Sequence, residues 1–128
     1  MKAFHTFRPR KDRHGNFKLD RFEIFTLLIS ALEWRKFNGS IKLVTDSFGK
    51  NYFKSLGILD AWNEIETSLD DLDSLKINEE IFWAGSKIFA LHLQKSPVVM
   101  IDLDFICWRQ IDFSRFGKNI AVIHREDI

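Results

Sequence analysis

The stretch that decides the fold is Val98-Val99-Met100-Ile101-Asp102-Leu103-Asp104. Four apolar residues in a row follow Pro97, and two carboxylates separated by one residue come directly after them. An apolar run of this length between turn-forming residues is typical of a strand that is buried on both faces of a parallel sheet. The stretch therefore predicts a buried β-strand whose carboxyl end carries Asp102 and Asp104.

Around this stretch, strand patterns alternate with helical ones. Strand patterns occupy residues 2–7 and 41–45, with a weaker one at 65–69 and a last one at 120–123. Helical patterns occupy about 20–38, 49–56 and 79–93. This alternation favours an α/β fold in which a mainly parallel sheet is flanked by helices. We expect one domain spanning residues 1–128, with ligands bound at the carboxyl ends of the strands.

Two of the expected helices have well-marked ends or faces. Asp20 followed by Glu23 is a capping-box pattern, and Gly39 ends the same segment. Apolar residues recur at helical spacing in this helix, at Phe22, Phe25, Ile29, Ala31 and Leu32. The helix at 79–93 is expected to bury a broad apolar face, made of Phe82, Ile88, Phe89, Leu91 and Leu93. The four tryptophans are expected in the core: Trp34, Trp62, Trp83 and Trp108. The alternative is a platform on which a sugar stacks, and Trp108, four positions after the acidic pair, is the first candidate for it.

Composition narrows the class of protein. The chain is 45% hydrophobic, which is enough apolar surface to offset the entropy of ordering it. Its formal net charge of +1 predicts no nucleic-acid partner. A single cysteine, Cys107, excludes an internal disulfide framework and a cysteine-rich zinc site, and it suits a reducing cytoplasm. The sequence has no apolar run long enough to cross a bilayer and no signal-peptide pattern after Met1.

The two carboxylates at the end of the apolar run indicate a metal site. Burying an unpaired carboxylate costs several kcal/mol, so a pair at the end of a core strand needs a strong partner. On an extended backbone, residues two apart leave the strand on the same side, so Asp102 and Asp104 would share one Mg²⁺ or Mn²⁺. The metal would neutralise the charge of a bound diphosphate. The alternative is that the pair caps a helix or forms surface salt bridges.

Three segments resemble one enzyme family. Residues 99–106, with Asp102 and Asp104 at their centre, are similar to the apolar strand and DXD motif of GT-A type glycosyltransferases. Residues 82–91 resemble the helix before that strand in bacterial polysaccharide and lipopolysaccharide sugar transferases, and Leu43-Val44-Thr45-Asp46 resembles the second strand of the fold. The resemblance spans about residues 3–122. It implies a Rossmann-like N-terminal half of a GT-A fold, which binds a nucleotide-diphosphate sugar as donor.

The resemblance also implies roles for individual residues. Asp104 would coordinate Mn²⁺ or Mg²⁺, and Asp102 would contribute through the metal or the ribose. Lys87 would reach the diphosphate or the donor sugar. The nucleobase and ribose would be lined by Asp46 and by the end of the first strand, His5, Thr6 and Phe7. Two alternatives stay open, because Asp46 could equally cap the helix that follows it and Lys87 could be an ordinary surface residue.

The first loop adds basic groups at the same edge of the sheet. Residues 8–18 include Arg8 and Arg13, and the loop opens at the carboxyl end of the first strand. Arginine suits bidentate contacts to phosphate, so either residue is a candidate for closing over the diphosphate. The alternative is that the loop only keeps the protein soluble.

The chain departs from the family in its second half. A GT-A enzyme continues past the strand that follows the DXD motif, where it has its acceptor site and often a late histidine ligand. We therefore expect donor binding rather than complete transferase activity, and the saccharide acceptor is unknown. We also expect open apolar surface, and self-association through it, at Phe105, Phe113 and Phe116.

Two other classes of protein remain open at this stage. The chain could be a non-enzymatic α/β interaction domain whose acidic pair binds a structural ion or caps a loop. It could also be a phosphatase of the haloacid dehalogenase type, although that motif usually has Thr or Val where Ile106 stands.

Overall fold

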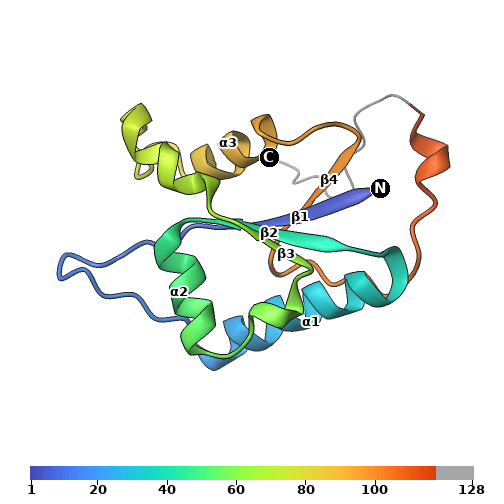
Figure 1. Cartoon of the computed structure of the whole chain (residues 1–128), viewed down its shortest axis with the longest axis horizontal. Helices are drawn as coiled ribbons and strands as arrows, with labels where there is room; N and C mark the ends of the chain where they lie inside the picture. The colour runs from blue at the N-terminus through green and yellow to red at the C-terminus, as the bar shows by residue number, and fades with distance from the viewer. Residues whose placement is uncertain (118–128) are drawn as a thin grey trace.

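The fold is built around one parallel sheet. The computed structural model describes residues 1–117 (Figure 1). The strands are β1 (Lys2–Phe7), β2 (Ile41–Thr45), β3 (Glu64–Glu66) and β4 (Val98–Ile101), in the spatial order β3-β2-β1-β4. Every pairing between them is parallel, which confirms the predicted α/β class with a Rossmann-like sheet flanked by helices. The strand predicted at 120–123 lies outside the described residues.

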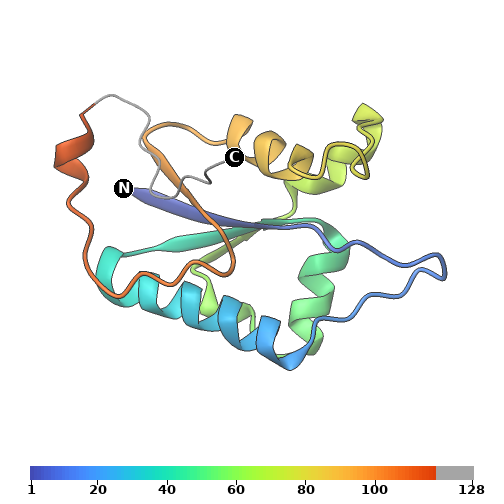
Figure 2. The ribbon, with the colours of Figure 1, turned by 180° about the vertical axis from the view of Figure 1, so that it is seen from behind.

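Helices cover both faces of the sheet. α1 (Arg21–Asn38) and α2 (Ser47–Ser55) lie on one face, together with the 3-10 helix η1 (Leu59–Ala61), as Figure 1 and Figure 2 show. α3 (Gly85–His92) and the 3-10 helix η2 (Ser68–Leu75) lie on the other face. A larger apolar core fills the α1 side, and a smaller one on the α3 side consists of Phe4, Val44, Leu69 and Ala90.

The first helix begins and ends as its sequence predicts. The Asp20 side chain accepts a hydrogen bond from the Glu23 backbone N–H at 2.8 Å, and the Glu23 side chain accepts one from the Asp20 N–H at 2.9 Å. This is the predicted capping box, which satisfies two backbone donors that a helix N-terminus otherwise leaves without partners. Gly39, with φ at +97°, ends the helix in a backbone conformation that residues with a Cβ rarely adopt.

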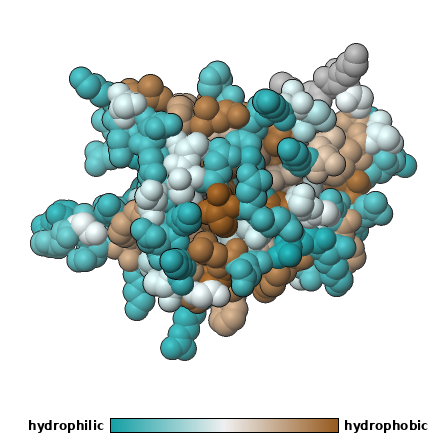
Figure 3. Space-filling model, in the orientation of Figure 1, coloured by the Kyte–Doolittle hydropathy of each residue, from teal (hydrophilic) through white to brown (hydrophobic). Residues whose placement is uncertain are grey.

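α1 is apolar on two opposite faces. Its inner face buries Leu27, Ser30, Ala31 and Trp34. Four further apolar residues point to solvent, with Phe22 78% exposed, Phe25 62%, Leu32 49% and Ile29 39%. Apolar residues reach the surface along the lower edge of Figure 3, where α1 lies in that view. A surface helix normally turns polar and charged residues to solvent opposite its buried face, so four exposed apolar residues on the outer face of α1 are unusual.

The expectation for the helix at 79–93 is wrong in both its start and its buried face. α3 begins at Gly85, and residues 79–84 form turns. Ile88, Leu91 and Leu93 are exposed, whereas the small residues Gly85, Ser86 and Ala90 are the buried ones. Small side chains let α3 lie close to the sheet, and Phe89 is the larger residue of α3 that packs against the core there.

The sequence predicted that β4 is buried on both faces, and this expectation is wrong. Val98 and Val99 are half-buried, Met100 is 38% exposed, and only Ile101 is buried. The reason is its position, because β4 pairs with β1 on one side and forms the edge of the sheet within residues 1–117. The third strand is also shorter than predicted: β3 ends at Glu66, and residues 68–75 turn into η2.

The segment after β4 folds back over α1. The Asn38 amide ties it down, since Asn38 Nδ2 donates to the Arg109 carbonyl at 3.1 Å and Asn38 Oδ1 accepts from the Ile111 N–H at 2.8 Å. Phe105 and Phe113 pack against the larger core, and the rings of Trp34 and Phe113 lie 6.1 Å apart.

The expected open apolar surface is therefore not found at Phe105 and Phe113. Phe116 is also half-buried, with its ring 6.2 Å from that of Phe113. These residues belong to the segment after β4 that packs on α1. The local sequence does not reveal this contact, because it joins residues that are far apart in the chain. Between residues 1 and 117, every helix is too short or too polar to cross a bilayer.

The tryptophans divide into two pairs. Trp34 and Trp62 are buried, as predicted. Trp83 and Trp108 are 64% and 65% exposed, so the expectation that they belong to the core is wrong. Both lie in turns or irregular segments instead of on a face turned toward the sheet.

Candidate functional site

The predicted site lies where the strand order reverses. β1 is followed along the chain by β2 on one side of it, while β4 pairs with it on the other side. Open parallel sheets bind ligands beside the carboxyl ends of the two strands at such a point. His5 is level with Ile101 in the sheet, so Thr6 and Asp102 are the next residues along the two strands. The carboxylate pair therefore follows β4 at the edge where such sheets bind ligands.

The acidic pair sits on a turn and not on extended backbone. β4 ends at Ile101, and the Phe105 N–H donates to the Asp102 carbonyl at 3.0 Å. The Phe105 carbonyl in turn accepts from the Ser30 hydroxyl at 2.5 Å, which draws the chain toward α1. The predicted extended geometry at residues 102–104 is thus wrong, because the next residues are anchored to a helix. Asp102 and Asp104 are both exposed.

Lys87 lies beside the acidic pair. Its ammonium group forms an ion pair with the Asp102 carboxylate, although the two residues come from α3 and from the turn after β4. The Lys87 side chain is 32% exposed and that of Asp102 is 55% exposed, so this pair is open to solvent. Two residues that the sequence assigned to one site are therefore in contact.

Trp83 belongs to the same cluster, and sequence reasoning missed it. Lys87 Nζ lies 5.5 Å from the centroid of the indole ring, within the range of a cation–π contact. The available signal was the spacing, because Trp83 precedes Lys87 by four residues in a segment with a helical pattern. The cluster of Trp83, Lys87 and Asp102 combines an aromatic surface, a cation and an anion at the surface of the protein.

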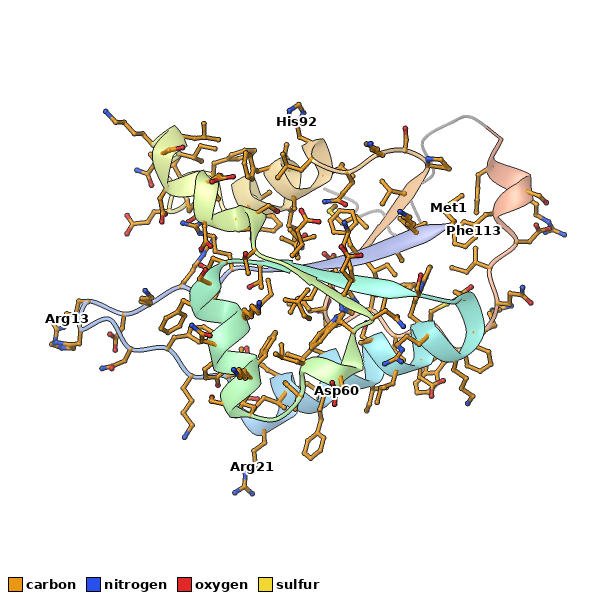
Figure 4. All side chains as sticks on the ribbon, viewed as in Figure 1. Met1, Arg13, Arg21, Asp60, His92 and Phe113 are labelled. Atoms are coloured by element: carbon orange, nitrogen blue, oxygen red, sulfur yellow. The ribbon has the colours of Figure 1, made fainter. Side chains whose placement is uncertain are left out.

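Arg8 is held by the protein itself. Its guanidinium donates to the Leu69 carbonyl at 2.8 Å, contacts Glu79 Oε2 at 2.9 Å and also pairs with Asp73. The Arg8 side chain is only 13% exposed. In this conformation Arg8 fixes η2 and the segment after it to the end of β1. Arg13, the other candidate in the loop, lies at the tip of the projecting loop (Figure 4).

His5 of β1 is fully buried, between Trp62 and Ser30 of α1. Trp62 Nε1–H donates to His5 Nδ1 at 3.1 Å, so the proton of the neutral ring is on Nε2, which lies 3.1 Å from Ser30 Oγ. The Ser30 hydroxyl in turn donates a hydrogen bond to the Phe105 carbonyl. Burial lowers the pKa of His5 from 6.5 to about 4, and the nearby negative charge of Asp102 offsets part of that effect. Both ring nitrogens are thus engaged inside the protein, and the chain of bonds orients the turn that carries Asp104.

The remaining predicted residues lie in the core or at a helix cap. Thr6 is 7% exposed, and its hydroxyl oxygen is buried without a hydrogen-bond partner in the structure. The Phe7 ring stacks on Phe53 with centroids 4.5 Å apart. Asp46 accepts from the Gly49 N–H at 2.6 Å and caps α2, which was its alternative interpretation. The structure therefore brings Lys87 together with Asp102, while Phe7 and Asp46 are engaged elsewhere.

Asp102 and Asp104 are the residues that would hold a metal at this edge of the sheet. Among residues 1–117, the side chains of His, Cys, Asp and Glu form no group of three that could hold a metal ion. Mg²⁺ commonly keeps several waters and takes one or two carboxylates together with phosphate oxygens. Asp102 and Asp104 supply oxygen ligands of that type at a solvent-exposed position.

A family model covers every residue of this site. Comparison with curated proteins and with solved structures gave no match for the chain. A family model matches residues 1–126, from before β1 to beyond the last residue that the structure describes. The chain therefore belongs to DUF6734, a family of unknown function.

Proposed function

We propose that this chain is the donor-binding portion of a metal-dependent glycosyltransferase. It binds a nucleotide-diphosphate sugar through the DXD motif of Asp102 and Asp104. The observation that carries the proposal is the position of this pair, directly after β4 and beside the carboxyl end of β1, where the strand order reverses. The resemblance of residues 99–106 to the GT-A motif supports the same assignment.

The side chains at this edge divide the work of holding a diphosphate. Asp104 and Asp102 supply oxygen ligands for Mn²⁺ or Mg²⁺, and the metal supplies positive charge that balances the diphosphate. Lys87 is paired with Asp102 in the present structure. With Asp102 holding a cation, the Lys87 ammonium would be free to contact a phosphate oxygen.

The proposed function also implies partners and a compartment. The saccharide acceptor is a partner that we leave unnamed. We place the activity in the cytoplasm, where a free thiol such as the buried Cys107 stays reduced. We also propose self-association through exposed apolar surface, now assigned to the outer face of α1.

A thermal-shift titration tests donor binding. The nucleoside diphosphates of uridine, guanosine, cytidine, adenosine and thymidine are added with Mn²⁺, with Mg²⁺ or with a chelator. A ligand that binds only the folded state raises the melting temperature by mass action. We expect a rise with one nucleotide that requires the metal and is abolished in Asp104→Asn.

The matched control is Asp60→Asn, which makes the same chemical change at an exposed residue of the 3-10 helix η1, on the α1 side of the molecule (Figure 4). Asp60→Asn should keep the full nucleotide shift. A shift that survives in Asp104→Asn, or that needs no metal, would contradict the role of the DXD pair. Absence of any shift in the wild-type chain would contradict donor binding and favour a non-enzymatic interaction domain.

A further inference from the structure

We infer that Trp83 is the platform on which the nucleobase of the donor stacks. This inference rests on the proposed function and names one subsite of it. It assigns the recognition of the base to a residue on the α3 side of the sheet, beside Lys87 and Asp102. His5 and Asp46, which the family resemblance suggested for that role, are hydrogen-bonded within the protein.

The position of Trp83 relative to the proposed phosphate site is the first argument. Lys87 touches both partners, because its ammonium pairs with Asp102 and lies 5.5 Å from the Trp83 ring centroid. A diphosphate held by Lys87 and by a metal on Asp102 would therefore have the indole next to it. In a nucleoside diphosphate the base is joined to the phosphates through the ribose, so a base stacked on Trp83 would suit the reach of the same molecule.

The exposure of Trp83 is the second argument. The indole is 64% exposed, although a ring of this size is among the most favourable side chains to bury. A flat aromatic ring at the surface offers a face on which every base can stack, because all bases have a π-face. Trp108 is equally exposed at 65%, but the indole that Lys87 contacts is that of Trp83.

The segment that carries Trp83 is fastened to the edge of the sheet, which is the third argument. Arg10 Nη2 donates to the carbonyl of Trp83 at 3.3 Å and to that of Glu79 at 3.4 Å. Arg8 pairs with the Glu79 carboxylate at 2.9 Å. Two arginines of the loop after β1 thus fix residues 79–83 before any ligand binds, which lowers the entropy lost on binding.

Calorimetric titration of Trp83→Ala tests the inference. Two probes are used, each with Mn²⁺. The first is inorganic pyrophosphate, which has the phosphates but no base, and the second is the nucleoside diphosphate that gives the largest thermal shift. We expect Trp83→Ala to weaken the nucleotide about ten-fold and to leave pyrophosphate unchanged, because stacking acts on the base alone. Trp83→Phe should restore most of the loss, since it keeps an aromatic face.

Trp108→Ala is the matched control, because it removes an indole of the same exposure. It should leave both affinities unchanged. An equal loss of pyrophosphate and nucleotide in Trp83→Ala would mean that Trp83 only supports Lys87, and unchanged binding of both would remove it from the site. A loss confined to the complete nucleotide sugar, with the nucleoside diphosphate unaffected, would assign the ring to the sugar and overturn the inference.

The same data separate this inference from the proposed function. If wild-type protein binds Mn²⁺–pyrophosphate and Asp104→Asn does not, donor binding by the DXD pair stands whatever Trp83 does. If the wild-type chain binds neither probe, the proposed function fails and the stacking assignment fails with it.

Discussion

At the residue scale, His5 holds the candidate site in place from inside the core. Its neutral ring accepts from Trp62 and faces Ser30, and Ser30 donates to the carbonyl of Phe105, just after the acidic pair. Protonation would place a second N–H on Nδ1, opposite the N–H of Trp62, so the charged ring loses this bond. The bonds that orient the turn of Asp102 and Asp104 therefore require an uncharged histidine.

A dependence of stability on pH follows from the lowered pKa of His5. The unfolded chain takes up this proton near pH 6.5 and the folded chain only near pH 4, so stability falls as the pH is lowered between these values. Over this window His5 accounts for a loss of roughly 3 kcal/mol, at about 1.4 kcal/mol per pH unit of pKa difference. We expect urea unfolding measured from pH 7 to pH 4 to show this loss, and His5→Gln to reduce the slope.

His14→Gln is the control for that experiment, since His14 is exposed in the first loop. It should leave the pH dependence of the wild-type chain unchanged. If His5→Gln shows the same slope as the wild type, the loss comes from other groups and the buried neutral histidine does not cause it.

At the element scale, α2 lies so close to β2 that one position tolerates only glycine. A Cβ at Gly49 would lie 2.2 Å from Thr45 Oγ1 and 3.2 Å from both Asp46 Oδ1 and Phe7 Cδ1. The hydroxyl of Thr45 is fully buried, so it has little room to move away. The contact joins α2 to the sheet, because Phe7 is the last residue of β1 and Asp46 is the cap of α2.

Gly49→Ala should destabilise the protein, although alanine normally stabilises a helix relative to glycine by roughly 0.5–1 kcal/mol. Overpacking a fixed core costs roughly 1–3 kcal/mol, so the clash outweighs the gain in helix propensity. Chemical denaturation measures the change. Adding Thr45→Ala removes the nearest clashing atom, so the double variant should recover much of the loss; no recovery would show that Thr45 is not the obstacle.

At the scale of the whole molecule, the outer face of α1 is an exposed apolar surface that a partner could cover. The spacing of Phe22, Phe25, Ile29 and Leu32 is three, four and three residues, which is the spacing of a helix–helix seam. The order of these spacings is the same in both directions along the helix. Two antiparallel copies of α1 would therefore set Phe22 opposite Leu32 and Phe25 opposite Ile29, so a second copy of this chain fits the face.

We expect sedimentation velocity to show concentration-dependent dimers, and Phe25→Glu to weaken them at least ten-fold by placing a charge in the seam. Ile81→Glu is the matched control, because Ile81 is 82% exposed and belongs to the segment before α3. It should leave the dimer intact. A monomer at every concentration, or equal loss in both variants, would assign no such role to α1.

The sequence predicted those features of the fold that depend on neighbouring residues. The alternation of strands and helices, the capping box of Asp20 and Glu23, and the position of Asp102 and Asp104 after a strand all follow from short-range spacing. Hydrogen bonds within a helix, and the step of a strand, join residues that are close in the chain. A short stretch is therefore sufficient to specify them.

The tertiary structure alone decided which of those residues are buried and which meet. Among residues 1–117, β4 lies at the edge of the sheet, Phe25 of α1 is exposed, and Ser30 donates to the carbonyl of Phe105, 75 residues further along. The same holds for the site, where Trp83 joined Lys87 and Asp102, and His5 was withdrawn into the core. The sequence determined the chemistry available at the sheet edge, because residue type and local spacing are written in it. Only the packing of distant segments determined which groups share that edge, because burial depends on what the rest of the chain covers.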